Sequence, residues 1–111
     1  MDEAQLQKAM KLIAYAGDSR SLSIRAMAKA EDEQIEEAEQ LLTDAKKSLH
    51  EAHNIQTAWM SAEMNGEPVE KTILLIHSQD HFMAADIMLT VADKYIGMAK
   101  NLKALSNPNN D

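Results

Sequence analysis

Two histidines and an aspartate lie within five residues of one another in an otherwise apolar part of the chain. His77, Asp80 and His81 are flanked by aliphatic and methionine side chains in residues 73–76 and 83–89. In a helix, His77 and His81 are i,i+4 neighbours on one face, and Asp80 is three residues from His77. Ionisable groups in such surroundings need partners, because burying an unpaired charge is expensive. This cluster is therefore the first candidate for a functional site.

The histidine pair is compatible with two chemistries. An i,i+4 pair on a helix can chelate a transition metal. Alternatively, a partly exposed imidazole can act as a nucleophile and carry a phosphoryl group. Earlier in the chain, His53 and Gln56 follow one edge of another predicted helix and can approach the cluster. They would then hold an imidazole tautomer or donate to phosphate oxygens, unless they are ordinary surface polar residues.

Asp80 occupies a position in an a/d-like stripe where a coiled-coil seam expects Leu or Ile. If copies of the chain met along this stripe, their carboxylates would approach one another. At about 4.5 Å and an effective dielectric constant of about 20, each like-charged pair costs roughly 3–4 kcal/mol. Such a ring needs protons or a divalent cation, and oxygen ligands suit a hard ion such as Mg²⁺. The alternative is that Asp80 faces solvent between subunits as a polar residue that fixes register.

Composition favours a single all-α domain. The chain has 111 residues with three Gly and two Pro, and it is rich in strong helix formers. Its formal charge is −7, and no run of basic residues exceeds the pair Lys46-Lys47, which argues against nucleic-acid binding. The absence of Cys excludes disulfides and thiolate metal sites. Residues 1–30 show no basic segment followed by an apolar one, and no apolar run is long enough for a membrane span, so we expect a cytoplasmic protein.

Capping and turn signals divide the chain into three predicted helices. The first begins at Asp2 as its N-cap, and Asp32 is the predicted N-cap of the second. Residues 65–68, Asn-Gly-Glu-Pro, are the strongest turn signal, with the glycine ending one helix and the proline opening the next. The third helix is then expected to run to Leu102 or Leu105. The sequence thus predicts an antiparallel three-helix bundle.

Residues 1–105 form one predicted domain, and the polar residues 106–111 are expected to be a disordered tail. The second predicted helix carries an unbroken heptad seam in which small and large residues alternate, as close helix packing requires. The members of this seam are Ile35, Ala38, Leu42, Ala45, Leu49, Ala52, Gln56 and Trp59.

The third predicted helix carries two apolar stripes. The first comprises Val69, Ile73, Ile76, Asp80, Met83, Ile87 and Lys94. The second comprises Leu74, His77, His81, Ala84, Met88, Val91 and Tyr95. Two partner helices cover one such stripe well, and covering both requires other copies of the chain. The sequence therefore predicts a homo-oligomer.

Three motifs resemble one known family. They are Ala-Gly-Asp-Ser-Arg-Ser (16–21), Glu-Ala-His-Asn-Ile-Gln-Thr (51–57) and His-Ser-Gln-Asp-His-Phe-Met (77–83). In type and spacing they are similar to the lactose/cellobiose-type enzyme IIA of the bacterial phosphoenolpyruvate-dependent sugar phosphotransferase system. The similarity extends over nearly the whole chain. The family often has Gly or Ala where Ser78 follows the first histidine here.

The resemblance implies a homotrimer of three-helix protomers, with nine helices in all. It implies that His77 accepts a phosphoryl group on Nε2 from the phosphocarrier HPr and passes it to a cysteine of enzyme IIB, which serves the membrane enzyme IIC. It also implies that Asp80 binds a divalent cation, Mg²⁺ being the expected ion, shared by three subunits on the three-fold axis. His81, Gln56 and His53 match family positions near the site.

Three other functions are weighed against this one. A helical metalloprotein would use His77, Asp80 and His81 as ligands without phosphoryl chemistry. A structural or adaptor trimer would use the third helix only for assembly. A histidine phosphotransfer domain of a two-component system is a weaker rival, because those proteins usually form four-helix bundles with a basic residue after the histidine.

Overall fold

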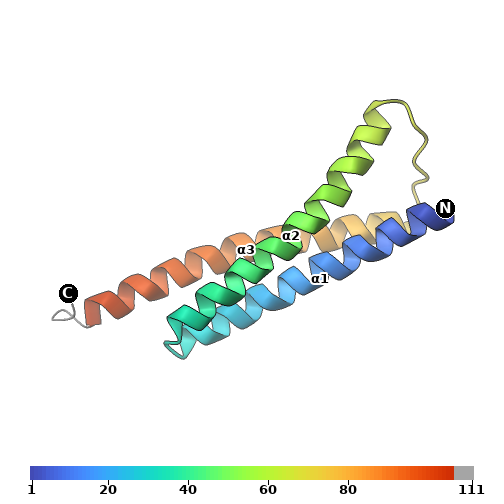
Figure 1. Ribbon diagram of the computed structural model, residues 1–111. Coiled ribbons are helices and arrows are strands. Elements are labelled where there is room, and N and C mark those ends of the chain that lie inside the picture. The colour runs from blue at the N-terminus through green and yellow to red at the C-terminus, as the bar shows by residue number, and fades with distance from the viewer. Residues whose placement is uncertain (107–111) are drawn as a thin grey trace.

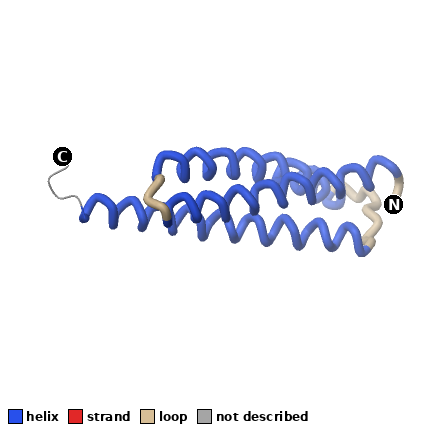
Figure 2. The backbone as a smooth tube through the Cα atoms, turned by 90° about the horizontal axis from the view of Figure 1, so that it is seen from below, coloured by secondary structure: helices blue, strands red, loops and turns tan. Residues whose placement is uncertain are grey.

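Three long helices make up the protein. The computed structural model describes residues 1–106, with α1 spanning Glu3–Glu31, α2 Ile35–Met64 and α3 Ile73–Ser106; this part of the chain has no strand. Successive helices run antiparallel and form a rod of 61 × 21 × 17 Å (Figures 1 and 2). None of these helices combines the length and apolar character that crossing a membrane requires. The prediction of an all-α, three-helix chain is confirmed.

The N-terminus of α1 agrees with the prediction, and the connection between α1 and α2 does not. Asp2 is the N-cap of α1, as expected, and its carboxylate accepts a hydrogen bond from the backbone N–H of Gln5 at 2.8 Å. Asp32, however, is the C-cap of α1, and Gln34 is the N-cap of α2. Between them Glu33 adopts a left-handed conformation with φ 63°, which reverses the chain. The prediction of Asp32 as N-cap was therefore wrong by two residues.

The second connection is longer than the sequence suggested. Asn65 caps α2, and Gly66 has φ 80°, so the predicted turn is present. The helix does not restart at Pro68, since α3 begins only at Ile73. The reason is Thr72, whose hydroxyl accepts a hydrogen bond from the N–H of Leu75 at 3.1 Å and caps the helix. Of the predicted tail, Ser106 ends α3, and residues 107–111 lie outside the described residues.

The core is made mainly of small side chains. The predicted seam of α2 is buried or half-buried along its whole length, which confirms it. Two buried clusters hold the helices together, one at each end of the rod. The first contains Ala9, Leu12, Ala16, Ala52, Trp59, Leu75 and Ala85. The second contains Ala26, Ala30, Ala38, Leu42, Ala92 and Ile96. Alanine dominates both clusters, so the backbones approach closely and bury little apolar area per residue.

Helix α3 buries neither of the two predicted stripes completely. Its buried positions are Leu75, Ser78, Ala85, Ala92 and Ile96, which form a third stripe between the two. The first predicted stripe faces outward: Ile73 is 82% exposed and Ile87 is 57% exposed. The second predicted stripe is only partly covered, since His77 and Val91 are exposed and His81 is half-buried. The expectation that the protomer covers one of these stripes was wrong.

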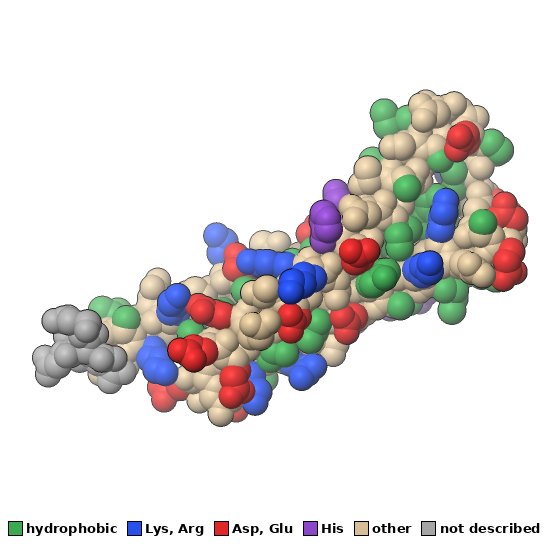
Figure 3. All heavy atoms as spheres, in the orientation of Figure 1, with side chains coloured by type: hydrophobic (Ala, Val, Ile, Leu, Met, Phe, Trp, Pro, Cys, Tyr) green, Lys and Arg blue, Asp and Glu red, His purple; other side chains and the backbone are tan. Residues whose placement is uncertain are grey.

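Helix α2 runs alongside α1 and α3 over only part of its length. Its C-terminal part diverges from α1 and α3, and residues 65–72 bridge the opening back to the start of α3 (Figure 1). Hydrophobic side chains show between this diverging part and the rest of the molecule, whereas acidic and basic side chains are interspersed over the narrower half (Figure 3). The divergence leaves a cavity beside the predicted functional residues of α2.

Candidate functional site

The two histidines of α3 touch each other. The Nε2 atoms of His77 and His81 are 3.0 Å apart, and the two rings meet edge to face with their centroids 4.5 Å apart. A hydrogen bond at this distance requires one ring nitrogen to donate and the other to accept, and the tautomers of the two rings decide which one donates. His77 is exposed and His81 is half-buried. The pair therefore lies on one helix and is open to solvent at His77.

The residues beside His77 point in opposite directions. Ser78 is completely buried, and its hydroxyl donates a 2.6 Å hydrogen bond to the carbonyl oxygen of Leu75. The Ser78 hydroxyl thus faces the bundle interior, away from the exposed His77 ring. Asp80 is exposed on the outward stripe of α3, between Ile76 and Met83. Within residues 1–106 its carboxylate has no hydrogen-bond or ion-pair partner.

His53 does not join the histidine pair in this chain. Its Nε2 atom lies 3.4 Å from the hydroxyl of Thr57, at the long end of hydrogen bonding, and its ring stacks on Phe82 with centroids 6.1 Å apart and an interplanar angle of 29°. Together with His50, it lines an open hollow between α2 and α3. His53 therefore contacts the residue that follows His81, without reaching either imidazole of the pair.

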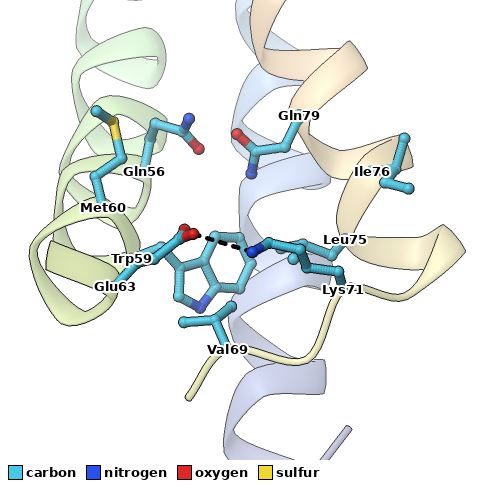
Figure 4. A pocket seen from close by; sticks show the side chains of 9 residues that line it. All are labelled: Gln56, Trp59, Met60, Glu63, Val69, Lys71, Leu75, Ile76 and Gln79. Atoms are coloured by element: carbon cyan, nitrogen blue, oxygen red, sulfur yellow. Dashed lines mark hydrogen bonds and ion pairs between the residues drawn. The ribbon is translucent and has the colours of Figure 1, made fainter. Parts of the chain in front are cut away.

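Gln56 lines the cavity below the diverging end of α2. This cavity has a volume of about 290 Å³. Figure 4 shows the amide groups of Gln56 and Gln79 pointing toward each other across it, one from α2 and one from α3. The side chains of Glu63 and Lys71 close one side through an ion pair of 3.0 Å. The Oε1 atom of Gln56 and the Nε1 atom of Trp59 are buried without hydrogen-bond partners.

Two groups of residues near the site were missed from the sequence. Gln79 belongs to the motif 77–83 and was given no role, although its position inside that motif was a usable signal. Arg20 and Arg25 of α1 line a hollow that includes His81. They are the only two arginines in the chain, which was also visible in the sequence. Their proximity to His81 depends on how α1 and α3 pack, which helical periodicity does not specify.

Within one chain, the described residues do not form a metal centre. No group of three or more His, Asp or Glu side chains in the described residues is placed to hold an ion. Asp80 supplies a single carboxylate, whereas a hard cation such as Mg²⁺ takes about six oxygen ligands. Its exposed position on an apolar stripe nevertheless fits a site to which several copies of the chain each contribute one carboxylate.

The chain matches known proteins over most of its length. Residues 7–100 match the family described as "PTS system, Lactose/Cellobiose specific IIA subunit". A lichenan-specific phosphotransferase enzyme IIA component of Bacillus subtilis is 39% identical over 93 residues, covering 84% of this chain and 82% of that protein. A lactose-specific IIA component of Staphylococcus epidermidis is 37% identical over 98 residues, covering 85% of this chain and 93% of the relative.

A solved structure has the same fold. The crystal structure of the cellobiose-specific enzyme IIA of Bacillus anthracis superposes with a TM-score of 0.88 at 35% identity, covering 94% of this chain and 95% of that one. Fold and motifs together define a component of the sugar phosphotransferase system. Within that system, the chain belongs to the lactose/cellobiose-specific enzyme IIA family, whose members are phosphocarriers. The predicted family is confirmed.

Proposed function

We propose that His77 is the residue that carries the phosphoryl group and that Nε2 is the reacting nitrogen. The observation that carries this proposal is the 3.0 Å contact between the Nε2 atoms of His77 and His81 on an exposed face of α3. Among the four histidines, this pair alone combines direct contact between imidazoles with an exposed ring. An exposed imidazole held by a polar neighbour can act as a nucleophile toward phosphorus.

The proposed reaction requires a particular pair of tautomers at His77 and His81. For Nε2 of His77 to attack, it must carry a lone pair, so the shared proton resides on Nε2 of His81 and the His77 proton on Nδ1. The lone pair of His77 attacks phosphorus as the phosphorus–nitrogen bond of phosphorylated HPr breaks, and the bonding electrons return to the departing imidazole. The Nε2–H of His81 is then free to donate to a phosphoryl oxygen.

Onward transfer uses the same geometry in reverse. A cysteine thiolate of enzyme IIB attacks phosphorus, a phosphorus–sulfur bond forms, and the bond to Nε2 of His77 breaks. Because His77 is exposed on a helix face, HPr and enzyme IIB can reach it in turn. We place this relay in the cytoplasm, where it supplies the membrane enzyme IIC during uptake of a lactose- or cellobiose-class sugar.

The working assembly in this proposal is a homotrimer built along the exposed face of α3. We define this face by Ile73, Ile76, Asp80, Met83, Ile87, Met98 and Leu102. Its six apolar members are all more than half exposed, an arrangement typical of an interface. Three Asp80 carboxylates at the axis would hold a divalent cation, with Mg²⁺ as the expected ion. The ion would offset the repulsion among the carboxylates.

His53 and Gln56 enter this proposal as supporting residues. Within one chain neither reaches His77, because His53 stacks on Phe82 and Gln56 faces Gln79 (Figure 4). Their contribution therefore requires an assembly in which α2 of one copy approaches the histidine pair of another. Within one copy the Oε1 atom of Gln56 is buried and has no hydrogen-bond partner.

The proposal is tested by phosphorylation in vitro. The wild type, His77→Ala and His50→Ala proteins are incubated with phosphoenolpyruvate, enzyme I and HPr, and the intact mass of each is measured. We expect one acid-labile phosphoryl group on the wild type and on the His50→Ala control, whose histidine is exposed on α2. We expect none on His77→Ala. Phosphorylation of His77→Ala would overturn the assignment.

A further inference from the structure

A hollow on the α1 side of the histidine pair has the chemistry of an anion site. It has a volume of about 270 Å³ and lies between α1 and α3. Its lining residues are Gly17, Arg20, Ser21, Ile24, Arg25 and His81. Two arginines, one serine and one histidine thus line a small open space, and no carboxylate is among the lining residues.

Both arginines have free hydrogen-bond donors. The chain has 18 acidic residues and a net charge of −7, so carboxylate partners are abundant. Yet every ion pair among residues 1–106 uses a lysine or the N-terminal ammonium group, and neither Arg20 nor Arg25 has a hydrogen-bond or ion-pair partner there. A guanidinium presents five N–H donors in a planar fork that matches phosphate oxygens.

Gly17 keeps the hollow open. A Cβ atom built at this position would meet no atom within 4 Å, so packing inside the protomer does not require a glycine here. A larger side chain at residue 17 would instead extend into the space beside Arg20 and Ser21. The next acidic residue along α1, Asp18, is turned toward α2, where its carboxylate accepts a 2.5 Å hydrogen bond from Ser48. The charge at the hollow is therefore positive.

His81 connects the hollow to the phosphoryl acceptor. It lines the hollow and also lies 3.0 Å from Nε2 of His77. A phosphoryl group on that nitrogen would carry about two negative charges and three acceptor oxygens next to His81. We infer that Arg20 and Arg25 bind the phosphoryl oxygens of phosphorylated His77 in this hollow, an inference that rests on the proposed role of His77. The arginines stay protonated throughout and exchange no proton with the phosphoryl group.

Anion binding can be measured without any phosphotransfer. Inorganic phosphate is titrated at constant ionic strength into ¹⁵N-labelled wild type, Arg20→Gln and Lys11→Gln, the last being a matched loss of one exposed charge on the same helix. We expect amide shifts of residues 17–25 and imidazole shifts of His81 in the wild type and in Lys11→Gln. Arg20→Gln should weaken binding about tenfold. Equal binding by both variants would overturn the inference.

Phosphoryl transfer provides the second readout. The rate of phosphorylation by phospho-HPr should fall about tenfold to a hundredfold in Arg20→Gln, since an exposed donor contributes less than a fully enclosed one. Arg20→Lys should recover only part of the rate, because it keeps the charge but loses the fork. Gly17→Leu should slow the reaction by occupying the hollow without changing any charge.

These outcomes separate the two proposals. If the wild type is phosphorylated on His77 and the three variants react as fast as Lys11→Gln, the arginine site is wrong and the function of His77 stands. If His77 is not the acceptor but phosphate still binds at residues 17–25 and His81, the anion site stands and the function proposed for His77 is wrong. Thermal unfolding of each variant confirms that loss of rate is not loss of fold.

Discussion

Three serine side chains are completely buried, and their hydroxyl groups differ in what they contact. The hydroxyl of Ser19 donates a 2.8 Å hydrogen bond to the carbonyl oxygen of Ala45 and so links α1 to α2. The hydroxyl of Ser78 bonds within its own helix. The hydroxyl of Ser23 has no partner. An unpaired buried hydroxyl is destabilising, whereas a paired one is mildly stabilising. Comparing Ser19 with Ser23 therefore tests how hydrogen bonding of a buried hydroxyl affects the stability of the protein.

The first prediction concerns this serine pair. Ser19→Ala should lower the free energy of unfolding by about 1 kcal/mol, since it removes the bond between α1 and α2. Ser23→Ala should leave the free energy of unfolding unchanged or raise it slightly, because it removes an unpaired hydroxyl. Urea denaturation followed by circular dichroism measures both. Equal losses in the two variants would contradict this account and would indicate that Ser23 is paired in solution.

Single residues of the candidate site were predictable where helical spacing alone decides the geometry. The i,i+4 spacing of His77 and His81 predicted neighbouring rings, and the two imidazoles touch. The relation of His53 and Gln56 to that pair was not predictable, because it depends on the rotation of α2 about its own axis and on the divergence of its end (Figure 1). Their supporting roles, like the acceptor role of His77, stay predictions.

At the scale of the helix, the contrast between the buried stripe and the other faces explains which predictions were correct. The seam of α2 was identified correctly because its other faces are polar, so one apolar period stands out. Helix α3 is apolar on more than one side, and its buried stripe contains Ser78, Ala85 and Ala92. Such a stripe looks weaker in the sequence than stripes of Ile and Met, yet the small residues allow close helix approach. Hydrophobicity therefore pointed to the outward faces of α3.

The turn after α2 provides a prediction at this scale. Gly66 has φ 80°, a conformation that costs a residue with a Cβ roughly 1–2 kcal/mol, so Gly66→Ala should destabilise the protein by about that amount. Gly97 lies within α3, and a Cβ there meets nothing within 4 Å. Gly97→Ala should therefore stabilise the protein by about 0.5–1 kcal/mol. Chemical denaturation of both variants checks the opposite signs, and a loss of stability in Gly97→Ala would point to a packed neighbour at α3.

In the molecule as a whole, the buried side chains are mostly small and many large apolar side chains are exposed. The buried clusters consist mainly of alanine, while large side chains such as Ile73, Met83 and Leu102 are more than half exposed. A rod with so small a core and so much exposed apolar surface would gain stability if copies associated, since each buried CH₂ contributes about 0.8 kcal/mol. The exposed face of α3 is where that gain is available.

Asp80 makes the proposed association testable. Asp80→Leu removes the repulsion among carboxylates at the axis, so the trimer should form about tenfold more tightly without divalent ions and should lose its dependence on Mg²⁺. Asp86→Leu, an equal change at an exposed position on another face of α3, should leave the dependence intact. Sedimentation velocity with Mg²⁺ or with a chelator measures both. A weaker trimer in Asp80→Leu would contradict the axial position.

The end of α2 that leaves the bundle carries the only tryptophan of the chain. Trp59 is 6% exposed and lines the cavity between α2 and α3, with its indole N–H unpartnered (Figure 4). The protein therefore has a built-in optical probe at the joint where α2 diverges from the bundle (Figure 1). Wetting of the cavity would move the fluorescence emission to longer wavelengths, and closure of α2 over it would move the emission to shorter ones. Each encounter that changes this joint can thus be timed by stopped-flow without a label.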